Sequence, residues 1–264
     1  MKKYLVLLLA LVLVVSLAAC NTPEETTGET EAPKTEGTTA GTTEETTAEE
    51  TDEPDPFEGM DAMTHAEYVA AELDAPVVVE AYVQATQSWW DNKITVYLQD
   101  ADGGYLAYEM VCSEEDAAKL VPGVKIRIKG YKTEWSGEVE IASGATFEFI
   151  DGADTFVAEP ADLTGILANE EELIKHQNEL AIFKNLVIDS ITYKNGEPGD
   201  DIYVNVKQGD KTFSFCVERY LTDPDTEVYK MFAELEVGDV VDIIGFVYWY
   251  NGINTHITEV VVNG

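Results

Sequence analysis

The chain has 264 residues, and its 51 acidic side chains against 16 basic ones give a formal net charge of −35. Such a charge opposes non-specific binding to nucleic acid and docking on anionic lipid headgroups, because both depend on Lys and Arg beside phosphates. Residues 57–264 alone hold 39 acidic and 13 basic side chains. Solubility in a salty exterior is the simplest interpretation of this excess.

The first twenty residues have the pattern of an export signal. Lys2 and Lys3 precede an apolar run from Tyr4 to Leu17 that is too short to span a bilayer comfortably. The run ends in Leu17, Ala18, Ala19 and Cys20, which resembles the lipobox of bacterial lipoproteins. The resemblance implies that residues 1–19 are a lipoprotein signal peptide and that Cys20 becomes the lipid-bearing N-terminus. The alternative is an ordinary secretory signal with a chance cysteine.

Residues 20–56 are predicted to be a disordered tether. Between Asn21 and Pro56 there are twelve Thr and twelve Asp or Glu, and there is no Val, Ile, Leu, Met, Phe, Trp or Tyr. Such a segment cannot bury enough apolar surface to offset its ordering entropy. As a random coil it would span roughly 30 to 35 Å. Its threonines are also possible acceptors of O-linked sugars.

A repeat divides the remaining chain into two parts. At one constant offset, six positions of the first copy fall on six of the second: Leu120, Gly123, Ile126, Ile128, Gly130 and Gly137 on Leu235, Gly238, Val241, Ile243, Gly245 and Gly252. Constant spacing across glycines and a hairpin turn indicates a duplicated domain. We expect a first domain over 57–151, a linker over 152–162 and a second domain over 163–264.

Each copy shows the period-two pattern of strands with one buried face. The expected strands are 77–88, 93–99, 104–112, 124–134 and 138–149, then 181–193, 201–207, 211–217, 239–249 and 253–262. Tight turns are expected at Asp102–Gly103, Ser136–Gly137 and Asn251–Gly252, because these residues tolerate a positive φ. Capping residues predict short helices after Thr64, Ser113 and Asn169, and another helix over about 224–234.

Three strands, a helix and a two-stranded hairpin form the order of the OB-fold, a five-stranded Greek-key barrel. The stretch VYLQDADGGYLAYEM, from Val96 to Met110, looks like the second and third strands of OB-fold modules in extracytoplasmic lipoproteins and beside secreted nucleases. The predicted fold class is therefore all-β with short helices. It consists of two tandem five-stranded OB-fold-like barrels after a signal peptide and a disordered tether.

No arrangement typical of catalysis is visible, so we expect a protein that is not an enzyme and that holds no cofactor or metal. His65, His176 and His256 are scattered over two helices and a last strand, and no nucleophile with its base can be proposed. Asp100 and Asp102 are interpreted as hairpin-turn residues in preference to a fragment of a calcium loop. Cys112 and Cys216 are expected to be buried free thiols.

The OB-fold resemblance implies a ligand face along the second and third strands, flanked by the loops between strands one and two and between strands four and five. In the first barrel these loops carry Trp89 and Trp90 on one side and Trp135 on the other, with Tyr97 and Tyr105 expected near the face between them. Aromatic faces stack on sugar rings and on nucleobases alike. Packing at the barrel end is the alternative interpretation of each indole.

The second barrel offers a different surface. Tyr248, Trp249 and Tyr250 occupy its matching hairpin, whereas its first loop, 195–201, is acidic and has no aromatic residue. In the first barrel Lys125, Arg127 and Lys129 share one side of a strand. We interpret this stripe as a solvated face that neighbouring glutamates neutralise, and not as a phosphate site.

The leading hypothesis is a lipoprotein held by Cys20 on the extracytoplasmic face of a bacterial membrane, which binds a glycan, another polymer or a protein through the aromatic loops of its first barrel. Nucleic acid is the disfavoured ligand because of the charge. The alternatives are an extracytoplasmic single-stranded nucleic-acid binder and a purely structural lipoprotein that docks a partner. The sequence does not predict an oligomeric state.

Overall fold

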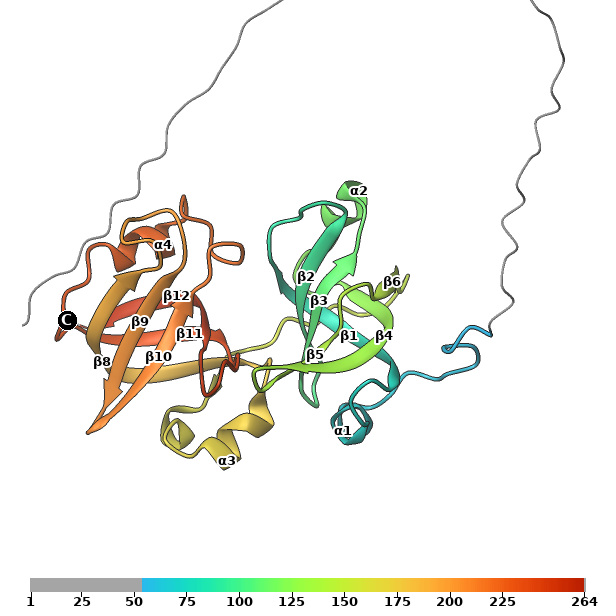
Figure 1. Ribbon diagram of the computed structural model, residues 1–264, viewed down its shortest axis with the longest axis horizontal. Coiled ribbons are helices and arrows are strands. Elements are labelled where there is room, and N and C mark those ends of the chain that lie inside the picture. Colours follow the sequence, from blue (N-terminus) through green and yellow to red (C-terminus); the bar gives the residue numbers. More distant parts are fainter. Residues whose placement is uncertain (1–53, 264) are drawn as a thin grey trace, which may run out of the picture. The chain divides into compact units, whose positions relative to one another are not determined.

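The computed structural model of this chain describes residues 54–263. The signal peptide, Cys20 and nearly all of the tether therefore lie outside the described residues. The first barrel comprises six strands and two short helices (Figure 1). They are α1 (His65–Ala70), β1 (Pro76–Thr86), β2 (Lys93–Gln99), β3 (Gly104–Val111), α2 (Glu114–Ala117), β4 (Lys125–Trp135), β5 (Glu138–Ile141) and β6 (Thr146–Phe149).

The first sheet closes in the order of an OB-fold. Its strands are arranged β1-β2-β3-β5-β4, and β4 pairs again with β1. The β3–β5 pairing is parallel, and the other pairs of the barrel are antiparallel. The expected strand 138–149 is in fact two strands, because a turn through Gly144, with φ of +90°, separates β5 from β6. The extra strand β6 then pairs with the first half of β4.

The second sheet repeats this topology, with strand order β8-β9-β10-β12-β11 and a closing β11–β8 pair. It contains β7 (Ala161–Asp162), η1 (Thr164–Ile166), α3 (Glu170–Leu173), η2 (Ile174–His176), β8 (Leu180–Tyr193), β9 (Ile202–Gln208), β10 (Lys211–Val217), α4 (Glu227–Phe232), β11 (Val240–Phe246) and β12 (His256–Asn263). The predicted class of two OB-fold-like β-structures in tandem is confirmed. The domain limits, with a linker over 152–162, remain a prediction.

Local sequence explains most helix starts. The Thr64 hydroxyl accepts from the Glu67 backbone N–H while the Glu67 carboxylate accepts from the Thr64 backbone N–H, which confirms the expected capping box. Ser113 caps α2 in the same way, through the N–H of Asp116. The predicted helix after Asn169 is present as α3, but the side chain of Asn169 makes no capping hydrogen bond. There, only the Asn169 carbonyl oxygen receives N–H groups of the helix.

The turns follow the expected chemistry at two hairpins out of three. Ser136–Gly137 and Asn251–Gly252 all have positive φ. The turn at Asp102–Gly103 does not use positive φ; instead Asp100 Oδ1 accepts from the backbone N–H groups of both residues. Asp100 is thus a turn residue, and within residues 54–263 no group of three metal-ligating side chains is found.

Each barrel has its own apolar core. Gly130 and Gly245 occupy matching positions of the repeat, and in each barrel neighbouring atoms pack closely against the glycine. A Cβ on Gly130 would lie 2.5 Å from Ile141 Cγ2, and one on Gly245 would lie 2.3 Å from the His256 carbonyl oxygen. No side chain fits at either position. Close packing therefore explains why glycine occurs at this position in both copies of the repeat. Cys112 and Cys216 are buried and free, as expected.

A third apolar cluster joins the two sheets. Tyr97 of β2 and Leu106 of β3 pack with Phe246 of β11, and the rings of Tyr97 and Phe246 stack at 4.5 Å. Part of the outer face of the first barrel is therefore covered by the second. No helix among residues 54–263 is long and apolar enough to cross a membrane.

Candidate ligand-binding site

Two exposed indoles border the outer face of β2 and β3. Trp90, in the loop between β1 and β2, is 67% exposed, and Trp135, at the end of β4, is 61% exposed. A tight turn holds Trp90 outside: its backbone exchanges two hydrogen bonds with Lys93, and both residues between them, Asp91 and Asn92, have positive φ. This is the geometry of a two-residue hairpin turn. The sequence prediction for these two indoles places them correctly at the surface.

Trp89 points the other way. It is half-buried against the first core, and its indole Nε1 donates a 2.9 Å hydrogen bond to the Cys112 carbonyl oxygen. A tryptophan with its N–H satisfied inside the protein fixes the loop and leaves little ring surface for a ligand. The expected group of three indoles is therefore reduced to two at the surface.

The two tyrosines predicted near the face are both fully buried, which corrects their placement. Tyr105 belongs to the inward-facing set of β3, where its ring lies 5.1 Å from that of Tyr68 and its hydroxyl donates to Asp100. Tyr97 does lie on the outer side of its barrel, but Phe246 of the second barrel covers it. Its hydroxyl lies 2.6 Å from Nδ1 of His256.

The residue that occupies the exposed part of the face is Tyr108, which the sequence interpretation missed. It is 40% exposed and follows the buried Ala107, so strand alternation alone places it on the outer side of β3. Counting inward and outward positions from Ala107 would have found it. Just beyond it, Glu109 has a φ of +43° and the β2–β3 register shifts, so the strand bulges beside the face.

Tyr108 is shared by two neighbouring hollows. The first, which we name the Trp90 hollow, has a volume of about 160 Å³ and includes Trp90, Tyr108 and Tyr220 in its lining. The second, the Trp135 hollow, has a volume of about 430 Å³. Its lining is Tyr108, Thr133, Glu134, Trp135, Glu140 and Tyr248. The second barrel thus contributes one tyrosine to each hollow.

The charge of this face is negative. In the Trp90 hollow the Lys93 ammonium pairs with the Glu109 carboxylate at 2.8 Å, and this hydrogen bond lowers the pKa of Glu109. In the Trp135 hollow Glu140 is only 6% exposed, and burial, with a smaller contribution from Glu109, raises its pKa to about 7. The face therefore offers aromatic rings and carboxylates, and its one lining cation is already paired.

The basic stripe of β4 is neutralised as expected. Lys125 and Arg127 both pair with Glu80 of β1 at 3.1 Å, and Arg127 also lies 3.9 Å from Glu148. Glu80 faces Arg127 directly in the strand register. The stripe therefore offers Lys129 alone as a cation without an ion pair among the residues that the structure describes.

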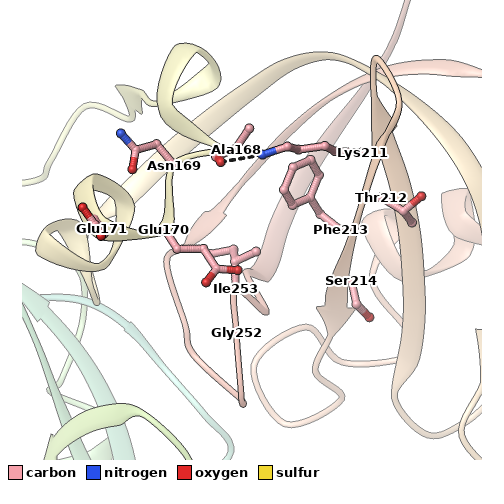
Figure 2. A pocket seen from close by; sticks show the side chains of 10 residues that line it. All are labelled: Ala168, Asn169, Glu170, Glu171, Lys211, Thr212, Phe213, Ser214, Gly252 and Ile253. Carbon is pink, nitrogen blue, oxygen red and sulfur yellow. Dashed lines mark hydrogen bonds between the residues drawn. The ribbon is translucent and has the colours of Figure 1, made fainter.

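Another hollow lies on the second barrel and has a volume of about 660 Å³ (Figure 2). Its lining comes from β10, the start of α3 and the turn at Gly252. Figure 2 shows Lys211 reaching across to the carbonyl oxygen of Ala168, to which its ammonium donates at 2.9 Å, with Phe213 below it. Phe213 is the single aromatic side chain in this lining and also packs on the second core. Besides Lys211, its polar lining residues are Asn169, Glu170, Glu171, Thr212 and Ser214.

The remaining aromatic residues of the second hairpin divide between interior and surface. Trp249 is buried, and its backbone N–H donates to Glu138 Oε2 at 2.7 Å. Tyr250 is exposed, and Tyr248 lines the Trp135 hollow. The tyrosine at the hairpin start therefore supplements the face of the first barrel and does not form a separate site.

A scan against protein-family models and a search of curated proteins found no match for this sequence. Several solved structures resemble this chain at low sequence identity. A murine DNA-binding protein bound to double-stranded DNA has a TM-score of 0.36 and 13% identity, and the match covers 72% of this chain and 96% of that one. The Ifi202 HINa domain with 20-bp double-stranded DNA has a TM-score of 0.34 and 12% identity, over 73% and 96%. A replication protein A heterotrimer bound to single-stranded DNA has a TM-score of 0.29 and 12% identity, over 72% and 49%. Similarity at this level does not identify the ligand of this chain.

Proposed function

We propose that this chain is a membrane-tethered extracytoplasmic binding protein without catalytic activity, which binds a glycan on the outer face of its first barrel. The observation that carries the proposal is the pair of exposed indoles, Trp90 and Trp135, with Tyr108 common to both of their hollows. Sugar rings stack on such aromatic faces, and carboxylates accept hydrogen bonds from sugar hydroxyls. OB-fold barrels bind oligosaccharides on this same surface.

Titration of the full-length chain with oligosaccharides, followed by tryptophan fluorescence, tests this proposal. Trp90→Ala and Trp135→Ala should each weaken binding, by about 1 to 3 kcal/mol if a sugar ring stacks as strongly as a base. Tyr131→Ala is the control, because this exposed aromatic side chain lines neither hollow and its loss should change binding little. Unchanged affinity in both alanine variants would refute the proposed face.

A single-stranded nucleic acid is the second candidate, because the position of the aromatic residues on the β2–β3 face also suits stacked bases. The charge argues against it, since Lys93 is paired and the basic stripe is largely neutralised. Titration with single-stranded DNA at low and high salt separates the two candidates. Binding through phosphates weakens steeply as salt rises, whereas binding of a neutral glycan does not.

The membrane attachment rests on the sequence of residues 1–20, with Cys20 as the lipid-bearing residue. The Cys20→Ser variant should leave the membrane fraction and appear in the medium or as an unprocessed precursor. Mass spectrometry of the mature N-terminus measures the modification directly. A soluble wild-type protein cleaved at another residue would refute the lipoprotein assignment.

A further inference from the structure

The two hollows of the aromatic face differ in the electrostatic state of their carboxylates. In the Trp90 hollow the Glu109 carboxylate accepts from Lys93 at 2.8 Å, from Tyr108 at 3.2 Å and from Ser143 at 3.2 Å. In the Trp135 hollow no Lys or Arg lines the surface. Glu140 forms no ion pair with any residue between 54 and 263. One hollow is internally neutralised, and the other holds two carboxyl groups without an ion pair among the described residues, the exposed Glu134 and the buried Glu140.

Three aromatic residues from separate parts of the fold line the same hollow as Glu140. Trp135 comes from β4, Tyr108 from β3, and Tyr248 from the segment after β11. The Tyr248 ring is held in place because it stacks on the buried His256 ring, with centroids 3.9 Å apart and planes 19° apart. A ring that is already fixed loses little entropy when a ligand contacts it.

Aromatic faces and a poorly solvated carboxylate favour the same kind of ligand. The face of an indole or phenol ring attracts a cation through its quadrupole. Glu140 is 6% exposed, and its loss of solvation is the main reason that its pKa rises to about 7. A cation beside it would restore the favourable electrostatic interaction that burial removes. A neutral sugar would leave the carboxylate without a counter-charge, and an anion would be repelled.

We propose that the Trp135 hollow binds a protonated amine, so that the ligand of the aromatic face is a glycan with free amino groups. This inference rests on the proposed glycan-binding function and narrows it to one substrate class. The rings of Trp135, Tyr108 and Tyr248 surround the ammonium group, and the Glu140 carboxylate pairs with it. A neighbouring neutral sugar ring then stacks on Trp90 in the other hollow.

The test compares two probes on the full-length chain at matched ionic strength: a glucosamine hexamer with free amines and the same hexamer with every amine acetylated. The free-amine hexamer should bind the wild type roughly tenfold more tightly. Glu140→Gln should abolish this preference, so that the variant binds the two hexamers with equal affinity. Glu114→Gln is the matched control, because it removes one exposed charge from α2, which does not line the hollow, and should keep the preference.

The outcomes separate the two proposals. Equal affinity for the two hexamers, or a preference that persists in Glu140→Gln, would overturn the amine site while glycan binding stands. If neither hexamer binds, the glycan proposal fails, and tetramethylammonium chloride then tests the hollow alone. Fluorescence quenching by this cation that is lost in Glu140→Gln but kept in Glu114→Gln would support the ammonium site. Absence of quenching in the wild type would refute it.

Discussion

The hydroxyl of Tyr97 in the first sheet lies 2.6 Å from Nδ1 of His256 in the second. The Gln87 amide donates to the same hydroxyl, and the phenol proton donates to the histidine in the tautomer whose Nδ1 carries no proton. Burial lowers the pKa of His256 to about 3, so the ring stays neutral and can accept this bond. This neutral hydrogen bond, with the rings of Phe246 and Tyr248 stacked beside it, is therefore one of several that link the two barrels, another being the bond from the Trp249 N–H to Glu138.

The first prediction concerns this bond. Tyr97→Phe keeps the ring that packs on Phe246 but leaves the buried Nδ1 of His256 without a donor. An unsatisfied buried acceptor costs about 1 to 3 kcal/mol of unfolding free energy. Urea unfolding measures the loss. Tyr131→Phe, in which the changed side chain is exposed, is the control and should unfold like the wild type.

The second prediction concerns pH and Glu140. Its pKa rises from 4.5 to about 7 on folding because burial disfavours the charged form. Between these values the folded chain binds a proton that the unfolded chain releases, so this group lowers stability as pH rises through the window. Glu140→Gln removes the penalty. We therefore expect the variant to melt at a higher temperature than the wild type above pH 7, and we expect the difference to disappear below about pH 4.5.

The comparison of melting temperatures across this pH range also needs Glu114→Gln as its control, because that substitution changes the same charge at an exposed position. The control should show no pH-dependent gain. A wild type that stays the more stable protein above pH 7 would show that the Glu140 carboxylate has a stabilising partner in solution.

The third prediction concerns the buried Lys132. Its ammonium donates to three carbonyl oxygens at the end of α1, those of Tyr68, Val69 and Ala71, at 2.7 to 3.0 Å. Helix ends leave such carbonyls without partners inside the helix. Lys132→Met keeps the aliphatic stem but removes all three bonds, and we expect a loss of about 2 to 4 kcal/mol in unfolding free energy. Lys129→Met on the same strand is the control and should cost far less.

The fourth prediction concerns the segment between the barrels. Gln84 of β1 binds it at two points, because its amide nitrogen donates to the Phe156 carbonyl and its amide oxygen accepts from the Ala158 N–H. Gln84→Ala should release this segment and accelerate limited proteolysis between residues 151 and 160. Mass spectrometry of the fragments locates the cut. If both proteins are cut there at the same rate, these two bonds do not hold the segment.

The strand pattern was predictable because it depends on local burial. The expected β2 (93–99) and β10 (211–217) agree with the structure, and most other strand ends differ by one to three residues. The largest differences occur beside turns that interrupt or shorten an expected strand. The 138–149 strand breaks at Gly144, and the last strand of the second barrel begins at His256 instead of residue 253.

The candidate site was less predictable, because a pattern within one barrel cannot show what the other barrel covers. Alternation correctly places Tyr97 on the outer side of β2, yet Phe246 packs over it. The same alternation places Tyr108 outside, where it remains exposed. Tyr220 and Tyr248 join the face from more than one hundred residues away in sequence. A sequence pattern within one barrel therefore could not predict that these two tyrosines line the face.

Because Tyr108 lines both hollows, ligands in the two hollows would contact the same side chain. If a ligand in one hollow moved the Tyr108 ring, the shape of the other hollow would change as well. Linkage then requires reciprocity: whatever factor the first occupant changes in the affinity for the second, the second must change in the affinity for the first. A ligand long enough to fill both hollows would thus bind as one unit, and the face would discriminate between ligands by the spacing of the two groups that enter the hollows.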